Sequence, residues 1–300
     1  MSNLDCQCLA IGSWQVASLP RIFELPAWAV SACHDWVTKW ERHFTPEETF
    51  VSQAFNTHSM LVKVDLGHVD ESTRRVSIFG VDDAPDGLGV ACRVNQDFAT
   101  KLQDVLASWP RVRSLVLDKA SDDHVWLGQP LSLLELGSCQ DLLLVRSAQN
   151  SQALATFASR SITPCANRNL RCWGQAVGLW SPVQTADQLP WKQGFVLKPR
   201  QGMSCRDVMI WRKGRYRGSS SRSQIHETLN RQGLMYCQNF IEPMRCPFLC
   251  NGKDWLMVLR AFFAFDVTAM KYRYLGGFWL SREENIRLHG STDAVVGPLQ

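Results

Sequence analysis

The residues of this sequence best suited to chemistry are a lysine and the turn that follows it. Lys198 lies near the end of a predicted strand, residues 194–199, and a second strand is predicted from Arg206 onward. A proline directly after the lysine ends the ladder pairing of the first strand. Gly202 and Ser204 lie in the turn between the strands, where backbone N–H groups can fold over an anion beside a fixed cation. The hairpin is therefore a candidate phosphate site.

Further candidates lie in the last third of the chain. Arg260 falls in the middle of an apolar predicted strand, where a lone charge is costly unless it is paired or functional. Arg282, Glu283 and Asn285 follow the next apolar run, and Asp293 comes shortly after them. Carboxylate and amide oxygens are ligands that hard cations prefer. This segment therefore suggests a metal site, while a solvated polar turn stays open as the alternative.

The order of these residues resembles that of the ATP-grasp superfamily of carboxylate–amine ligases. Lys198 matches the strand lysine that binds phosphate in that family, and residues 238–243 are similar to the hinge strand between its two lobes. A later strand arginine of the family matches Arg260. The resemblance covers residues 195–298 and implies ATP as the cofactor. The residues that it implies for ATP binding are Lys198, Gly202, Ser204, Gln238, Phe240, Ile241 and Arg260.

The same resemblance implies Mg²⁺ ions that bridge the phosphates of ATP. Glu283 and Asn285 match the family's Glu-x-Asn by letter, Asp293 is an alternative ligand, and the usual upstream acid is either Asp254 or Asp266. The spacing from the strand arginine to these residues departs from the family's pattern. That departure leaves open a divergent peptide ligase, or a degenerate member that binds nucleotide without turnover.

The reaction that the resemblance implies joins a carboxylate to an amine through an acyl phosphate. Lys198 and Arg260 would neutralise the phosphates of ATP, and Arg282 would bind the carboxylate of the substrate. The expected partners are therefore a small-molecule or peptide carboxylate and an amine. Nucleic acid is not an expected partner, because a net charge of +4 is too small to mark a nucleic-acid binder. No oligomeric state is predicted.

The first half of the sequence alternates helices with strands. Amphipathic helices are predicted over residues 26–44 and 96–108, and a shorter helix over residues 150–158. Strand patterns lie between and after the longer helices, at residues 60–65, 75–81, 113–118 and 141–146. This alternation is typical of an α/β domain on a mainly parallel sheet. We expect such a domain, of the kind that precedes an ATP-grasp unit, over residues 1–159.

The second half of the sequence has closely spaced strands and a single helix pattern. A connection that contains three prolines, residues 161–192, comes before them. The predicted strands cover residues 194–199, 206–212, 234–241, 255–265 and 272–280, and the predicted helix covers residues 223–232. We therefore expect an α+β, ATP-grasp-like nucleotide-binding and catalytic domain over residues 160–300.

The composition excludes several other classes of protein. The chain has 300 residues, of which 45% are hydrophobic and 20% charged, so it can bury a large core and is not a disordered protein. No stretch approaches the roughly 18 apolar residues of a membrane span, and the N-terminus lacks the pattern of a secretory signal. We therefore expect a cytoplasmic protein with reduced thiols.

The cysteines do not indicate a metal site. There are eleven of them, and none shows the paired spacing that zinc ligands have in structural sites. The best cluster is Cys237, Cys246 and Cys250, which we expect to behave as small hydrophobic residues.

Two alternative classes of protein stay open. A nucleotidyltransferase of the nucleic-acid-ligase kind would be adenylylated on Lys198, but the residues after it do not follow the Lys-x-Asp-Gly pattern of that family. A non-catalytic binding module would use the tryptophans of the first predicted helix and the basic turn at residues 212–222 as contact surfaces.

Overall fold

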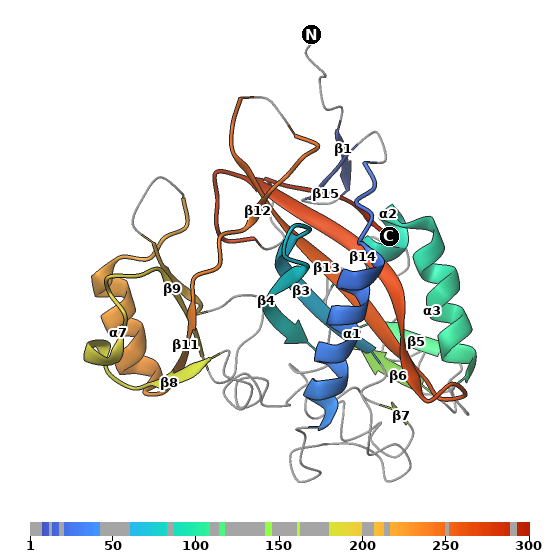
Figure 1. The fold of residues 1–300 in the computed structure, drawn as a ribbon, viewed down its shortest axis with the longest axis horizontal. Coiled ribbons are helices and arrows are strands. Elements are labelled where there is room, and N and C mark those ends of the chain that lie inside the picture. Colours follow the sequence, from blue (N-terminus) through green and yellow to red (C-terminus); the bar gives the residue numbers. More distant parts are fainter. Residues whose placement is uncertain are drawn as a thin grey trace.

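The protein is a mixed α/β structure built around one large and one small sheet. The computed structural model describes residues 8–11, 14–17, 21–42, 61–82, 87–108, 114–117, 142–145, 161–162, 180–199, 207–212, 217–249, 252–288 and 293–300. In this part of the chain the small sheet lies to one side of the large sheet, and helices cover both faces of the large sheet (Figure 1). This architecture is compatible with the α+β, ATP-grasp-like fold expected from the sequence.

The large sheet takes strands from both ends of the chain. Its order is β1 (Cys8–Ile11), β2 (Trp14–Ala17), β15 (Ala294–Leu299), β14 (Lys271–Glu283), β13 (Trp255–Asp266), β3 (Leu61–Asp70) and β4 (Arg75–Asp82), with β12 (Met244–Arg245) also paired to β13. Neighbours are antiparallel except β15 and β2, which are parallel.

This arrangement does not confirm the expectation of a separate N-terminal α/β domain on a mainly parallel sheet. Strands β3 and β4 are antiparallel, and β3 pairs with β13 from the far end of the chain. The division into residues 1–159 and 160–300 therefore does not coincide with the sheets. The physical reason is the burial of β13, which is buried from Leu256 to Asp266. A strand buried on both faces at the centre of a sheet needs a hydrogen-bonded neighbour on each edge. Strand β14 pairs with one edge of β13, and β3 pairs with the other.

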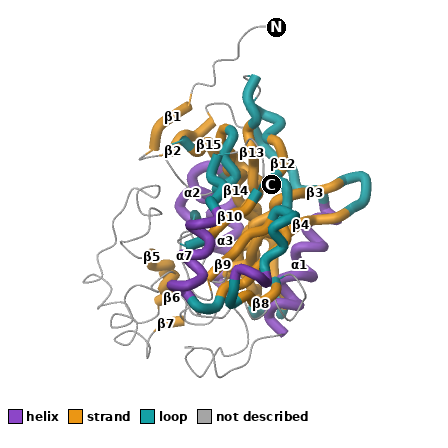
Figure 2. The backbone as a smooth tube through the Cα atoms, turned by 90° about the vertical axis from the view of Figure 1, so that its left-hand side faces the viewer, coloured by secondary structure: helices purple, strands orange, loops and turns teal. Residues whose placement is uncertain are grey.

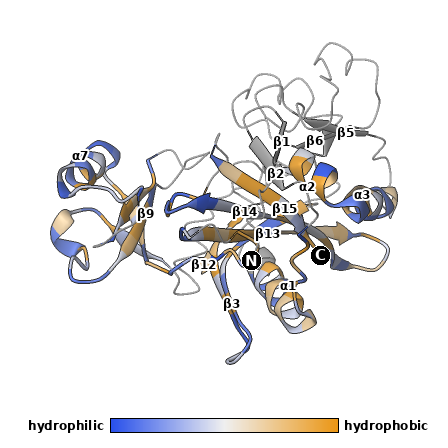
Figure 3. Ribbon diagram, turned by 90° about the horizontal axis from the view of Figure 1, so that it is seen from above, coloured by the Kyte–Doolittle hydropathy of each residue, from blue (hydrophilic) through white to orange (hydrophobic). Residues whose placement is uncertain are grey.

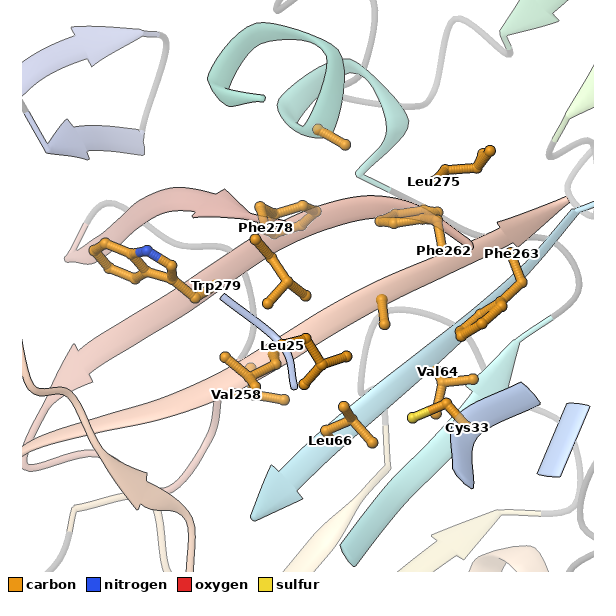
Figure 4. Close-up of a cluster of buried hydrophobic side chains, with 14 of the residues drawn as sticks. Leu25, Cys33, Val64, Leu66, Val258, Phe262, Phe263, Leu275, Phe278 and Trp279 are labelled. Atoms are coloured by element: carbon orange, nitrogen blue, oxygen red, sulfur yellow. The ribbon is translucent and has the colours of Figure 1, made fainter. Parts of the chain in front are cut away.

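Helices pack on both faces of the large sheet. Helix α1 (Ala27–Arg42) covers one face, against β3, β4 and β14, whereas α2 (Leu88–Val94) and α3 (Gln96–Ser108) cover the other (Figure 3). Phe98 of α3 meets Phe262 of β13 edge to face, with ring centroids 5.3 Å apart. Figure 4 shows the buried side chains of β3, β13 and β14 that form this core. The helices predicted over residues 26–44 and 96–108 are thus confirmed.

The small sheet has its own core under a single helix. Its order is β10 (Met209–Trp211), β9 (Phe195–Pro199), β11 (Met235–Asn239) and β8 (Ser181–Val183), with helix α7 (Arg222–Gln232) beside it and a short 3₁₀ helix, η3 (Ala186–Gln188), after β8. Seen from its own side, this unit lies in front of the large sheet (Figure 2). Ser221 and Gln224 form the capping box that begins α7.

A third, three-stranded sheet is parallel. It consists of β5 (Ser114–Leu117), β6 (Leu142–Val145) and β7 (Ser161–Ile162). The strands predicted at residues 113–118 and 141–146 are therefore confirmed. The helix predicted over residues 150–158 lies outside the described residues. Within the described residues no helix is long and apolar enough to cross a membrane.

Candidate functional site

The alternation of β9 directs Lys198 toward the large sheet. Phe195 and Leu197 point into the core under α7, so Val196 and Lys198 lie on the opposite face. The Lys198 ammonium donates to the carbonyl oxygen of Phe79 in β4 and to Gln238 Oε1, the latter at 2.9 Å. It also lies 4.9 Å from the centroid of the Trp180 ring. Lys198 therefore joins the small sheet to the edge of the large one.

Gln238 makes the second contact between the two sheets. It is directly opposite Val196 in the ladder, and its Nε2 donates to the carbonyl oxygen of Ile78 at 3.0 Å. The ladder of β3 and β4 is irregular at this point, because Asp65 pairs with Gly80 and the next residue of β3 pairs with Ile78. Phe79 is thus an extra residue in a bulge, and the bulge lets two carbonyl groups accept from side chains. Two residues predicted to bind ATP are brought together here.

Arg260 lies on the face of the large sheet that meets the small sheet. Its Nε is 3.7 Å from Asp65 Oδ1, and its Nη2 donates to the carbonyl oxygen of Leu288 at 3.4 Å. Arg260, Asp65 and Gly80 are direct neighbours across three strands, so the three Cα–Cβ directions share one face. Only 6% of the arginine is exposed, which agrees with the prediction that a charge in this strand is paired or functional.

Arg282 shares this face, which we call the inter-sheet face. It is opposite Leu256, which is four residues before Arg260 in β13, with no register shift between them. Arg282 donates from Nη1 to the carbonyl oxygen of Arg287 and from Nη2 to Asp293 Oδ2 at 2.8 Å. Arg282 and Arg260 therefore hold the carbonyl groups of two successive residues, 287 and 288, and anchor that segment across the sheet.

An apolar cluster separates the two sheets beside these cations. Leu256 of β13, Ile210 of β10 and Ile286 form its buried centre. Partly buried side chains surround them, namely Val196, Val208, Phe240 and Leu288. Leu256 thus lies under the small sheet, and Phe262 at the other end of the same face lies under α3. Arg260 falls between these two contacts.

Each of the three predicted metal ligands is engaged by a different residue. Glu283 follows Arg282 in the strand, so its side chain projects from the opposite face of the sheet. Its Oε1 is 2.6 Å from Lys253 Nζ. Asn285 Oδ1 accepts from the backbone N–H of Arg287 at 3.0 Å. Asp293 is the ion-pair partner of Arg282.

The two predicted upstream acids are also engaged locally. Asp254 pairs with Arg245 at 3.3 Å, and Asp266 pairs with Arg273 at 3.4 Å. The backbone N–H of Ala269, together with Arg273, lowers the pKa of Asp266. Among the described residues no group of three or more His, Cys, Asp or Glu side chains is placed to hold a metal ion. The five predicted ligands are therefore each engaged by a neighbouring residue.

The remaining predicted site residues divide into two groups. Gly202 and Ser204 lie outside the described residues. Phe240 lies in the apolar cluster, 5.2 Å from the guanidinium of Arg212, and Ile241 follows it, half buried. Phe240 is therefore at the border of the two sheets.

Lys63 and Asp65 were missed as site residues by the sequence analysis. They lie two residues apart in β3, so both belong to the inter-sheet face, and Lys63 is only 3% exposed. A signal was present, because two charges at this spacing interrupt an apolar strand on one face only. The strand was recognised from its pattern, but its partner β13 was not.

The described cysteines do not form a reactive centre. Cys33, Cys237 and Cys246 are buried. Burial raises the pKa of Cys33 to about 12 and that of Cys237 to about 11, so these thiols stay protonated at neutral pH. The expected behaviour as small hydrophobic residues is confirmed for Cys237 and Cys246, and Cys250 lies outside the described residues.

A short latch fastens the far end of the inter-sheet contact. Arg287 Nε donates to the carbonyl oxygen of Gly218 at 2.8 Å, and Arg217 forms a bridge with Asn285. Gly218 has a φ of 91°, and a Cβ there would lie 2.6 Å from Asn285 Oδ1. Asn285 is therefore packed as part of this latch.

A Gly218→Ala variant is expected to unfold about 1 kcal/mol more easily than a Gly233→Ala variant. Gly233 is a matched control, because its φ is 73° and a Cβ there would meet no atom within 4 Å. Both variants strain the backbone, but only Gly218→Ala presses on Asn285. Urea denaturation followed by circular dichroism measures the difference, and equal stabilities would show that the latch is loose.

Comparisons with known proteins assign no family. No family model and no curated protein matches the chain. Among solved structures, a glutathione synthetase-like effector from Globodera pallida, in its apo form, aligns at 10% identity and a TM-score of 0.43, over 93% of this chain and 88% of that chain. A likeness this distant carries no argument about activity.

Proposed function

We propose that this chain binds ATP between its small and large sheets. The observation that carries the proposal is the direction of three cations: strand alternation sends Lys198 of β9 toward the large sheet, and Arg260 and Arg282 toward the small one. Cations gathered from separate strands at one interface are suited to a polyphosphate. The apolar cluster beside them offers a surface for a base.

The partly buried members of the cluster are suited to contact adenine. Val196 and Phe240 come from the small sheet side and Leu288 from the large sheet side, so a flat ring between them would be covered on both faces. Binding there would have to open some of the contacts that now join the sheets. We therefore expect the phosphates of ATP to replace the contacts that Lys198 makes with Phe79 and Gln238. ATP would not fill a preformed cavity.

ATP is expected to raise the thermal midpoint of the protein, because a ligand that binds only the native state stabilises it by about 2.7 kcal/mol at a hundred times its Kd. A thermal-shift series with ATP, GTP, adenosine and tripolyphosphate tests this. We expect a response to ATP and a smaller one to tripolyphosphate, which lacks the base. Adenosine is the control for the phosphates and is expected to have little effect. No response to ATP at millimolar concentration would contradict the proposal.

The predicted reaction classes differ in what becomes of the bound ATP. A carboxylate–amine ligase would release ADP and phosphate when both substrates are present, and a nucleotidyltransferase would release pyrophosphate and form a Lys198 adduct. A non-catalytic module would bind ATP and return it unchanged. Chromatography of the nucleotides after incubation separates the three classes. The geometry supports binding most directly, because the proposal rests on the strand positions of Lys198, Arg260 and Arg282.

A further inference from the structure

The positive charge of this chain is concentrated in the small sheet and in the segments that connect its strands. From the start of β8 to the end of β11, residues 181–239, the sequence has ten Lys and Arg residues against three Asp and Glu residues. This stretch therefore carries a net charge of +7, whereas the whole chain carries +4, so the remaining residues sum to −3. The modest charge of the whole chain is thus an average over a basic unit and an acidic remainder. The basic unit is a candidate surface for a polyanion.

Four side chains of this unit form an aromatic–cation cluster, namely Trp191, Trp211, Arg222 and His226. The guanidinium of Arg222 lies 4.9 Å from the centroid of the Trp191 ring and 5.6 Å from that of the Trp211 ring. The His226 ring is stacked on Trp191, with centroids 5.7 Å apart. Hydrogen bonds fix both indoles, because Trp191 Nε1 donates to the carbonyl oxygen of Ala186 and Trp211 Nε1 donates to that of Trp191. The planar groups of the cluster are therefore held in place by rigid neighbours.

The cations of this cluster are open to solvent. Arg222 and His226 are exposed, and so is Lys192, which follows the first tryptophan. The exposed acids of the same unit are Asp187 and Glu227. Within the described residues neither of them forms an ion pair with Arg222 or Lys192. The N–H groups of these two cations are therefore open to an anionic ligand.

The aromatic–cation cluster faces away from the proposed ATP site. Trp211 packs with Phe195 and Leu197 in the core under α7, so strand alternation sends Ile210 and Lys198 to the opposite side of the small sheet. Figures 1 and 3 show α7 on the outer side of that sheet, away from the large one. A ligand on the cluster would leave the contacts between the two sheets in place. An activity of this surface therefore goes beyond the proposed function.

The chemistry of the cluster favours nucleic acid over a lipid surface. A guanidinium can donate to a phosphate and stack on a base with the same planar group, and seven of the ten cations in residues 181–239 are arginines. A membrane-binding surface usually adds apolar side chains that enter the bilayer. The large hydrophobic side chains that are exposed among the described residues, Ile22 and Met270, both lie outside this unit.

We infer that the aromatic–cation cluster, together with Lys192, binds single-stranded nucleic acid. Arg222 and Lys192 contact the phosphates, and a base stacks on the guanidinium of Arg222 or on the ring of His226. The bases of a duplex are already stacked on one another, so a duplex is held through its phosphates alone.

Fluorescence anisotropy with a labelled single-stranded RNA of about 20 nucleotides, longer than a typical single-strand site, tests the inference on the wild-type chain. We expect saturable binding that weakens with salt, with a slope of log K against log salt of about −2 for three neutralised phosphates. An abasic strand of the same length is expected to bind roughly fivefold more weakly or worse, because it lacks the stacked base. Equal binding of the abasic strand, or no binding of RNA at low salt, would overturn the inference. Binding to phosphatidylserine vesicles but not to RNA would also overturn it and would identify a membrane partner.

An Arg222→Gln variant assigns the binding to the cluster. Glutamine keeps much of the side-chain length but not the charge, so we expect a folded protein that binds the RNA roughly fivefold more weakly. Arg93→Gln is the matched control, because Arg93 is an exposed helix arginine in the last turn of α2, on the large sheet. Equal losses in the two variants would show that only net charge matters and would overturn the inference. Lys192→Gln, with the same control, gives the answer if Arg222→Gln does not fold.

Discussion

A Lys198→Met variant is expected to bind ATP about tenfold to a hundredfold more weakly than the wild type, as a lost charge-assisted hydrogen bond implies. Methionine retains the apolar stem but not the ammonium, which joins the Phe79 carbonyl group and Gln238. The same change leaves a buried Gln238 with one partner fewer, so we also expect a lower stability. Calorimetric titration of ATP, with a melting curve of each protein, measures both effects.

Lys271→Met is the matched control for this variant. Lys271 is also a strand lysine, but it is exposed at the start of β14, next to the turn after Asp266. The control is expected to bind ATP as the wild type does. A Lys198→Arg variant adds a second readout, because it keeps the positive charge and should retain more affinity than Lys198→Met. Equal ATP affinity in wild type and Lys198→Met would reject the phosphate role of Lys198.

An Arg260→Met variant is expected to lose about 3 kcal/mol of stability, in the range found when one partner of a buried ion pair is removed. The variant leaves Asp65 Oδ1 buried beside an apolar side chain and frees the Leu288 carbonyl group. Urea denaturation followed by circular dichroism gives the free energy of unfolding.

A double variant, Arg260→Met with Asp65→Asn, tests the cause of this loss. If the unpaired carboxylate is responsible, the double variant is more stable than Arg260→Met alone, because the buried negative charge is absent. Additive losses would show that Arg260 stabilises the protein mainly through its contacts with Leu288 and the Phe278 ring, whose centroid is 5.5 Å from the guanidinium. Either outcome reports on the residue that we place at the centre of the ATP site.

Periodicity predicted most of the elements that position the site. Helix α3 has the predicted bounds, and strands β9, β11, β13 and β14 lie within one to three residues of theirs. Strand β3 is longer than expected, because it continues to Asp70 before the turn. Strand β15 was not predicted, although all six of its residues are buried, because it is short and interrupted by a glycine and a proline.

Partners distant in sequence could not be predicted in the same way. Asn95 illustrates this: it follows α2, is fully buried, and donates to the carbonyl oxygen of Leu299 at 2.6 Å. Nothing near Asn95 in the sequence indicates that it will meet the last strand. The metal assignment has the same origin, since Glu283 and Asn285 match a motif by letter, but strand alternation and the contacts of Arg287 direct them elsewhere.

The sequence by itself determined which side chains share a strand face and which segments become helices. These properties depend on neighbours within a few residues, so the opposite directions of Leu197 and Lys198 follow from strand geometry alone. The tertiary structure decided that β3 joins β13, that Asp65 faces Arg260, and that Lys198 meets a bulge in β4. Such pairings depend on how whole apolar faces pack together, and many arrangements of strands bury the same residues equally well. Only the folded chain selects among them, and that selection assembles the cations of the inter-sheet face.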